Sequence, residues 1–307
     1  MSGDNSADTK PDLLVLPPVA AAFPPLDVEV AGRTHPGRVR PVNEDNFHVV
    51  RFGRYLRTVV SSLPAGHAPE EDSPPGYGFA VADGMGGHAA GEVASRAALA
   101  VLVEVALRTP DWVLGRDDEL LARVMERTAR RFRLVDEAVL DRTRGRPGLR
   151  GMGTTLSLAL SLSDALVVAH VGDSRVYLHR GGRLHRLTRD HTAGELLADR
   201  DPAAAARLGH VLTQCVGGVH PGCEPDVARF RLADGDRLLL CTDGLTDLVD
   251  DASIARELGR GASSDEACRA LVGLALDGGG RDNVTVVVAT YRRPDPPAAG
   301  PLPPSPA

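Results

Sequence analysis

Two apolar runs of the chain end in an Asp-Gly pair, and this arrangement constrains the fold more than any other feature. Residues 79–82 lead into Asp83-Gly84, and residues 238–241 are followed after one threonine by Asp243-Gly244. Short apolar runs bounded by turn formers predict buried strands. A glycine beside the acid lets another group approach the main chain closely. We therefore expect a fold whose buried strands carry acids at their ends.

Further acids stand beside other predicted strands. Asp173 and Asp282 adjoin apolar runs, and Glu44 and Asp45 precede a third. Each acid alone is readily explained as a turn cap or a surface charge. Together at strand ends they would repel one another, and hard divalent cations relieve such repulsion. Oxygen ligands favour Mg²⁺ or Mn²⁺ over zinc.

Composition excludes several classes of protein. The 307 residues are 43% hydrophobic and 25% charged, which is enough for a sizeable core. A formal net charge of -6 argues against a nucleic-acid surface. The four cysteines include no C-x-x-C pair, which predicts a reduced protein. No signal peptide and no apolar stretch of ~20 residues are evident, so we expect a cytoplasmic protein without a membrane span.

The predicted elements run in the order strands, two helices, strands, two helices, strand, which indicates an α+β fold with helices covering antiparallel sheets. Residues 154–162 alternate leucine with small or hydroxyl side chains, which predicts a strand with one buried face. We expect residues 165–187 to form a β-meander and 227–241 a hairpin, whereas 190–218 shows only short helical signals. Helices are expected at 89–107, 117–141, 252–258 and 264–276.

One folded domain is expected at residues 27–292. Residues 1–26 are rich in proline and alanine without periodicity, which predicts a disordered arm, and 293–307 read as a proline-rich tail. Residues 54–76 read as a long polar loop to which the sequence assigns no role.

Seven short motifs occur in order along residues 28–291. Together they resemble the metal-dependent serine/threonine protein phosphatases of the PPM (PP2C) family, in its bacterial form. The resemblance implies a four-layer αββα sandwich, with two central antiparallel β-sheets flanked by pairs of helices. The motifs are Arg-x-x-Asn-Glu-Asp, Asp-Gly-Met-Gly-Gly-His, Gly-Thr-Thr, Gly-Asp-Ser-Arg, Asp-His-Thr, Asp-Gly-Leu-Thr-Asp and Arg-Asp-Asn.

The resemblance also implies a dinuclear Mn²⁺ or Mg²⁺ centre. Asp83 would bridge the two ions, and Asp243 and Asp282 would complete the first. The carbonyl of Gly84 and the side chain of Glu44 would serve the second. Glycine suits its position because a side chain there would obstruct the ion's water shell.

Further roles follow from the same resemblance. Asp173 would hold a third, weaker ion together with Asp243. Asp45 would accept hydrogen bonds from coordinated waters and orient them. Arg40 would clamp the substrate phosphate bidentately, with Arg38 as its competitor.

The general acid is less defined by the motifs. Many eukaryotic members carry histidine directly after the first Asp-Gly, but here Met85 stands there and His88 follows three residues later. His88 is the candidate acid, with His191 and a metal-bound water as alternatives. His191 has a second interpretation, in which its motif orders the start of a flap beside the site.

The implied activity is hydrolysis of phosphoserine and phosphothreonine monoesters by direct attack of a metal-activated water. The expected partners are phosphorylated proteins, including a Ser/Thr kinase and its substrates, acted on by a monomer. The alternative is a catalytically silent relative that binds phosphoproteins and regulates. A plain divalent-cation binding protein is a third reading, against which the Arg40 clamp and the full motif order argue.

Overall fold

Two five-stranded antiparallel sheets lie at the centre of the computed structural model, which describes residues 26–53, 55–56, 71–72, 75–86, 90–108, 118–219 and 221–294. The first sheet has the order β1 (Asp27–His35), β15 (Val284–Arg292), β14 (Arg237–Cys241), β10 (Arg175–Arg180), β11 (Arg183–Arg186). The second has the order β13 (Asp226–Arg231), β9 (Ala165–Val171), β8 (Leu156–Leu162), β5 (Gly76–Ala82), β2 (Asn46–Phe52).

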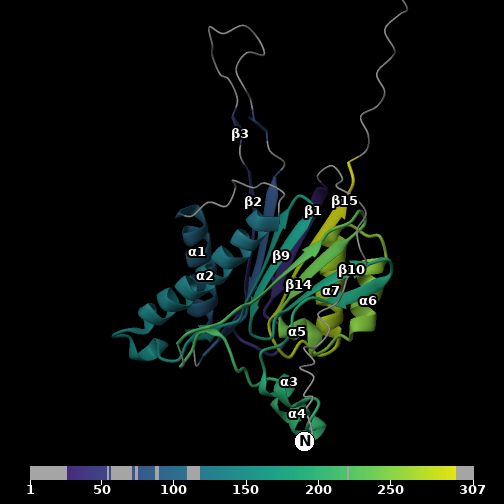
Figure 1. The fold of residues 1–307 in the computed structure, drawn as a ribbon. Coiled ribbons are helices and arrows are strands. Elements are labelled where there is room, and N and C mark those ends of the chain that lie inside the picture. Colours follow the sequence, from purple (N-terminus) through teal and green to yellow (C-terminus); the bar gives the residue numbers. More distant parts are fainter. Residues whose placement is uncertain are drawn as a thin grey trace, which may run out of the picture.

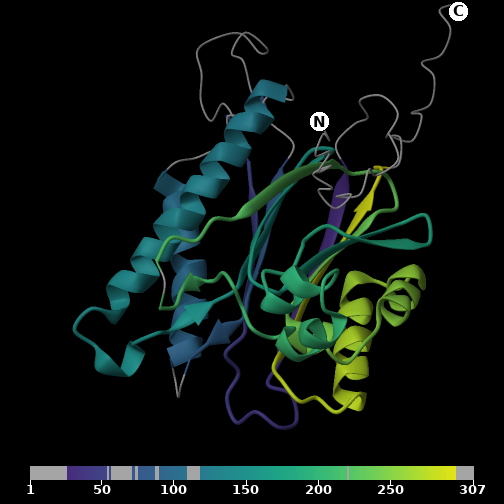
Figure 2. The same cartoon turned by 60° about the horizontal axis from the view of Figure 1, so that its bottom comes forward.

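A pair of long helices covers each outer face (Figure 1). Helices α1 (Ala90–Arg108) and α2 (Asp118–Thr143) pack on the second sheet, and α6 (Asp251–Gly259) and α7 (Ser264–Asp277) pack on the first. Figure 2 shows the two helical layers on opposite sides of the strands. The predicted four-layer α+β sandwich is confirmed.

Shorter elements complete the described chain. A three-stranded sheet contains β12 (Val216–Gly217), β7 (Gly153–Thr154) and β6 (Gly84–Met85), and β3 (Tyr55–Leu56) pairs with β4 (Glu71–Asp72). The segment expected to break the strand pattern contains α3 (Ala193–Leu197) and α4 (Pro202–Leu208). A turn η1 (Pro147–Leu149) and the short helix α5 (Asp243–Thr246) are the remaining elements.

The two-residue period of the strands divides the core into three layers. On β5, Phe79 and Val81 point into the layer between the two sheets, whereas Ala80 and Ala82 contact α1 and its neighbours. On β14, Leu238 and Leu240 point inward and Leu239 and Cys241 point to α6 and α7. Strands with two buried faces therefore read as continuous apolar runs.

The expectation of one buried face for 154–162 is wrong. Strand β8 is buried on both faces: its leucines face the helical layer, and Ala159 faces the central core. Among the inner-face serines, Ser157 is tolerated because its hydroxyl finds a partner: Ser157 Oγ lies 2.8 Å from His170 Nδ1.

The predicted meander is right only for the antiparallel pair β10–β11, and the predicted hairpin is wrong, because the chain crosses between the sheets before β10 and before β14. β9 lies in the second sheet and β10 in the first, and the crossing contains Gly172 at φ 110°. β13 and β14 likewise lie in different sheets. Their connection is held by Asp236, which accepts the Ala233 N–H at 2.7 Å and pairs with Arg180. The sequence showed each strand but not its partner.

Some expectations fall on residues that are not described. The arm at 1–26 and the tail at 293–307 lie outside the described residues except for positions 26, 293 and 294, and most of 54–76 does too. These remain predictions. In the part of the chain that is described, no helix combines the length and the hydropathy needed to cross a membrane.

Candidate active site

A pocket of about 760 Å³ opens where β5 and β14 end. It brings together seven of the nine residues predicted for the site. Asp45 does not line the pocket and is 3% exposed, and His88 lies outside the described residues. The seven are Arg40, Glu44, Asp83, Gly84, Asp173, Asp243 and Asp282.

Asp83 is held by its main chain, which leaves its carboxylate for the pocket. Its N–H donates to Thr155 Oγ1 at 3.0 Å, and its carbonyl accepts the Thr154 hydroxyl at 2.8 Å and the Thr155 N–H at 2.9 Å. Thr155 Oγ1 in turn lies 2.7 Å from Ser174 Oγ. The Gly-Thr-Thr motif therefore has a structural role, because its threonines hold the main chain of Asp83.

Packing alone requires glycine at position 84, whether or not an ion binds its carbonyl. A Cβ atom there would lie 2.1 Å from the carbonyl oxygen of Gly91 and 2.8 Å from that of Glu44. Its strand and the start of α1 approach so closely that only glycine fits. The N–H groups of Gly91 and Glu92 at the start of α1 face the Glu44 carboxylate and act to lower its pKa, against the larger effect of burial.

Asp243 begins the short helix α5, which the sequence did not predict. A Cβ atom on the following Gly244 would lie 1.9 Å from the carbonyl oxygen of Asn283. Beside Asp243, the hydroxyl of Thr242 donates to Asp45 Oδ2 at 2.8 Å. Asp45 therefore lies directly beneath the acids that line the pocket.

The Asp282 side of the pocket carries the positive charge. Arg40 Nη2 lies 2.6 Å from Asp282 Oδ2, and Arg40 keeps about half of its side chain exposed. Arg38 instead contacts the exposed Asp277 at 3.3 Å and does not line the pocket, which favours Arg40 as the phosphate ligand. Asn283 has a structural role, since its Oδ1 accepts the Glu44 N–H and its Nδ2 donates to two carbonyls.

The acids of the pocket raise one another's pKa values. Burial, and then the carboxylates of Asp45, Asp243 and Asp173, raise the pKa of Asp83 well above its usual value. Burial and neighbouring acids likewise raise the pKa values of Asp45, Asp173 and Asp243. Burial is the main cause of the raised pKa of Glu44. Removing water from carboxylates and bringing them together both disfavour their charged forms.

Two carboxylate oxygens at this site find no hydrogen-bond partner in the described part of the chain. They are the buried Asp45 Oδ1 and Asp243 Oδ1. Buried polar atoms are ordinarily paired, so these oxygens indicate a missing positive charge or bound water. The acid cluster therefore fits divalent cations.

The side chains do not form a closed metal cage. Among the residues that the structure describes, no three His, Cys, Asp or Glu are grouped so as to hold an ion by themselves. Mg²⁺ commonly keeps several waters and binds through only one or two carboxylates. A pocket of this size leaves room for such waters.

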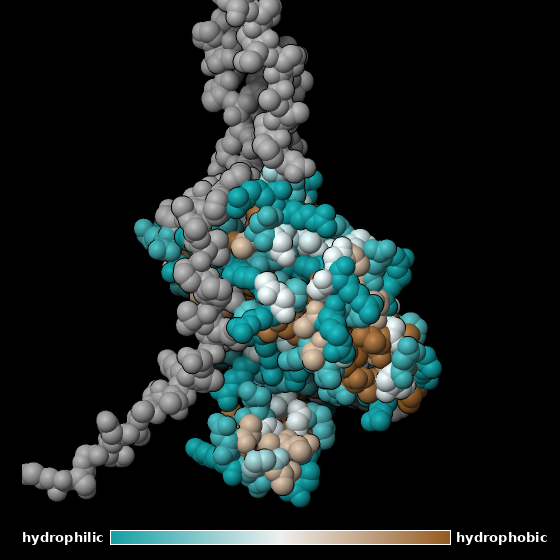
Figure 3. Space-filling view, turned by 90° about the vertical axis from the view of Figure 1, so that its right-hand side faces the viewer, coloured by the Kyte–Doolittle hydropathy of each residue, from teal (hydrophilic) through white to brown (hydrophobic). Residues whose placement is uncertain are grey.

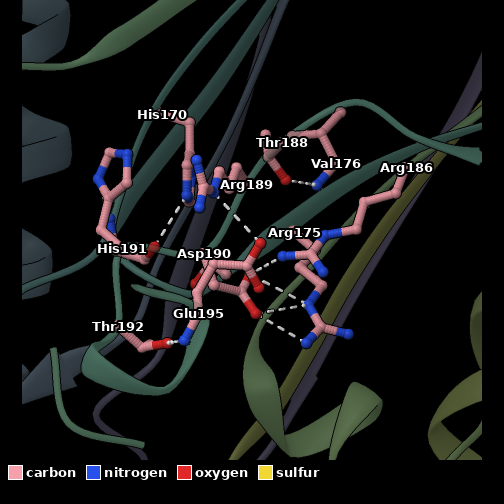
Figure 4. Close-up of polar contacts among 12 residues, drawn as sticks. His170, Arg175, Val176, Arg186, Thr188, Arg189, Asp190, His191, Thr192 and Glu195 are labelled. Atoms are coloured by element: carbon pink, nitrogen blue, oxygen red, sulfur yellow. Dashed lines mark hydrogen bonds and ion pairs between the residues drawn. The ribbon is translucent and has the colours of Figure 1, made fainter. Parts of the chain in front are cut away.

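The Asp190-His191-Thr192 segment connects the base of the pocket to the flap, residues 190–218. Asp190 pairs with Arg175 and Arg186, as Figure 4 shows, and Thr192 Oγ1 accepts the N–H of Glu195 to cap α3. His191 Nε2 lies 3.1 Å from Asp226 Oδ2, and the His191 N–H donates to Gly172 O. His191 does not line the pocket, so the structure supports its ordering role and not its role as an acid.

Sequence reasoning missed two residues of this region. Asp247 lines the pocket, and after burial its charge contributes most to the raised pKa of Asp243. Its position four residues after Asp243, one turn of helix later, was the available signal. Asp136 on α2 accepts backbone N–H groups of Gly217, Gly222 and Cys223, and so fixes the loop of residues 215–223 that lines one side of the pocket.

Comparison with known proteins identifies the family. The family model described as "Protein phosphatase 2C" matches residues 71–274. The serine/threonine protein phosphatase PstP of Mycobacterium tuberculosis is 38% identical over 216 residues, which cover 69% of this chain and 40% of the relative. The chain thus spans less than half the length of that relative.

Other relatives are matched along almost their full length. The serine/threonine phosphatase stp of Listeria monocytogenes is 32% identical over 262 residues, covering 83% of this chain and 93% of the relative. The solved catalytic domain of PstP in complex with two manganese ions superposes with a TM-score of 0.68 at 34% identity, covering 87% of this chain and 99% of that one. The predicted family is confirmed by these matches, and the chain belongs to the protein phosphatase 2C family.

Proposed function

We propose that this protein hydrolyses phosphoserine and phosphothreonine monoesters in phosphorylated proteins. The observation that carries the proposal is the convergence of six acids and Arg40 in one pocket, with buried, unpartnered carboxylate oxygens on Asp243 and on Asp45 beneath it. The relatives named serine/threonine phosphatases support the same reaction. A phosphorylated kinase and its targets would be substrates of this kind.

The proposed site holds two Mn²⁺ or Mg²⁺ ions. Asp83 lies among the other acids and would bridge the ions, with Asp243 and Asp282 on one side and Glu44 and the Gly84 carbonyl on the other. When bound, the ions would neutralise the phosphoryl oxygens and activate a water. The two manganese ions of the PstP catalytic domain support this choice of metal.

The remaining residues would orient the reactants. Asp173 lies near Asp243, as a third and weaker ion would require. Asp45, fixed by the hydroxyl of Thr242, would orient coordinated waters from below. Arg40 pairs with Asp282 and would turn to the substrate phosphate, where a guanidinium can bind two oxygens. His88 remains the candidate acid for the leaving alkoxide.

The decisive experiment measures hydrolysis of p-nitrophenyl phosphate and of a phosphothreonine peptide with and without Mn²⁺. We expect turnover by the wild type only with metal, and a loss of ~10²–10³-fold in Asp243→Ala, since charge stabilisation at such a site contributes about that much. Equal rates in the two proteins would exclude Asp243 from the site. Binding of the phosphopeptide without turnover would support the silent, regulatory alternative.

The same assay tests His88. If it is the acid, His88→Ala loses the basic limb of the pH–rate profile, because the group that protonates the leaving alkoxide is gone. A profile of unchanged shape removes His88 from the mechanism.

A further inference from the structure

Exposed apolar side chains are concentrated around the pocket. Among the described residues, six large hydrophobic side chains are exposed; four of them line the pocket or lie within two residues of one that does, and a fifth, Leu196, lies on α3 of the neighbouring flap. Isolated exposed hydrophobics are normal, but such a grouping marks an interaction surface. We call these five the apolar rim: Val39 (67% exposed), Val42 (47%), Leu196 (63%), Val211 (40%) and Val219 (74%).

The apolar rim comes from parts of the chain that are far apart in sequence. Val39 and Val42 flank Arg40 on the loop between β1 and β2, and Val219 itself lines the pocket. Val211 and Leu196 belong to the flap, which is tied together by the hydrogen bond from the Ala193 N–H to the Val211 carbonyl. In Figure 3 the lobe containing α3 and α4 projects from the body and shows pale-brown, mildly apolar surface.

Charge does not select a partner at this flap. Apart from Asp190, which is paired with Arg175 and Arg186, residues 189–211 carry three arginines and three acids, so their charges cancel. Arg189 is itself paired with Glu195. A strongly acidic or basic peptide would therefore gain little there. The flap would therefore contact a bound polypeptide mainly through its apolar side chains.

The geometry of a phosphopeptide fits this rim. A phosphorylated side chain that reaches the acids and Arg40 places its own main chain at the mouth of the pocket. Each neighbouring residue of an extended peptide extends the chain by about 3.3 Å, so residues within three positions lie within about 10 Å of the mouth. Their side chains would meet the residues bordering it.

We propose that the apolar rim docks apolar side chains flanking the phosphorylated residue, so that the substrates are phosphopeptide segments with apolar neighbours within about three positions. This proposal rests on the proposed phosphatase function. Burying one valine-sized side chain changes an equilibrium by about tenfold. The preference for apolar over polar neighbours is therefore of that order.

The test compares two phosphothreonine peptides in the presence of Mn²⁺, one with leucine and valine flanks and one with serine and glycine flanks. For each protein, kcat/KM is measured for both peptides and divided by its own kcat/KM for p-nitrophenyl phosphate. We expect the wild type to favour the apolar peptide about tenfold. The double variant Val39→Ser, Val219→Ser should lose most of this preference.

Leu107→Ser is the matched control. Leu107 is the sixth exposed hydrophobic, 63% exposed at the end of α1, and it lines a separate apolar cavity between that helix and the second sheet. This variant should keep the wild-type preference. Loss of the preference in it would assign the effect to general destabilisation and overturn the proposal.

Other outcomes are equally decisive. A wild type that hydrolyses p-nitrophenyl phosphate but treats both peptides alike leaves the phosphatase function standing and removes the docking role of the apolar rim. A preference that survives Val39→Ser, Val219→Ser also removes it. Failure to hydrolyse any of the three substrates contradicts the proposed function itself.

Discussion

Two of the regions that bury aspartate in this molecule treat it in opposite ways. Asp136 on α2, 2% exposed, accepts three backbone N–H groups, from Gly217 at 2.6 Å, Gly222 at 2.9 Å and Cys223 at 3.3 Å. At the floor of the pocket, Asp45 Oδ1 and Asp243 Oδ1 have no partner.

This difference separates a structural carboxylate from a functional one. Backbone N–H groups stabilise the charge of Asp136, and in return that carboxylate fixes the loop of residues 215–223. At the floor, one carboxylate oxygen of Asp45 and one of Asp243 lack any donor among the described residues, and burial together with neighbouring acids raises the pKa values of both side chains. A fold that satisfies one buried acid fully and leaves others unsatisfied is arranged to bind cations at the latter.

The largest expected effect is on turnover, and it comes from removing a carboxylate charge at the floor of the pocket. Asp83→Asn should lower metal-dependent turnover of p-nitrophenyl phosphate by ~10³-fold, because one neutral amide replaces the central carboxylate. The metal-free variant should nevertheless be more stable than the wild type, since a source of repulsion is gone. Turnover is measured with Mn²⁺, and stability by urea unfolding with EDTA. A metal-free variant less stable than the wild type would mean that Asp83 is a structural acid like Asp136.

The second effect is on stability. Asp136→Ala leaves three N–H groups without their acceptor, and we expect it to lower the free energy of unfolding by about 3 kcal/mol. Urea unfolding in EDTA measures the change. The matched control is Asp118→Ala on the same helix, whose exposed ion pair with Arg229 should contribute less than about 1 kcal/mol. Equal losses in both variants would show that the three hydrogen bonds carry no special weight.

Much of this contrast could be read from local sequence, and part of it could not. The apolar runs ending at Asp83 and Asp243 predicted buried strands with acids at their ends, because strand periodicity and turn residues act locally. The burial of Ser157 could not be foreseen, since its hydroxyl is paired by His170 on another strand.

Sequence reasoning missed the pairing between distant elements for the same reason. Nothing near Gly172 indicates that the chain leaves one sheet for the other there, because strand partners are chosen by long-range packing. The anchoring role of Asp136 was invisible because its donors lie more than eighty residues away. The unpartnered state of Asp243 Oδ1 is likewise a property of the assembled pocket.

The smallest expected effect is the pH dependence of the metal-free protein. Burial and neighbouring acids raise the pKa of Asp173 to about 8 and that of Asp45 to about 7 in the folded state. Because these values exceed the unfolded ones, the folded chain binds more protons, and stability is lost as pH rises through the folded pKa values. Buried His170, whose pKa burial lowers to about 4, acts in the opposite sense below its unfolded value near 6.5.

The window that isolates the floor acids is therefore pH 6.5 to 8. There we expect the unfolding free energy in EDTA to fall by about 1 kcal/mol, within the limit of about 1.4 kcal/mol per pH unit for one titrating group. Saturating Mn²⁺ should flatten the dependence, because cations hold the acids ionised in the folded state. Asp173→Asn should reduce the slope without metal, because one of the acids that titrate in this window is gone while Asp45 remains. A slope that Asp173→Asn leaves undiminished would remove Asp173 from the acids that this fold leaves unsatisfied.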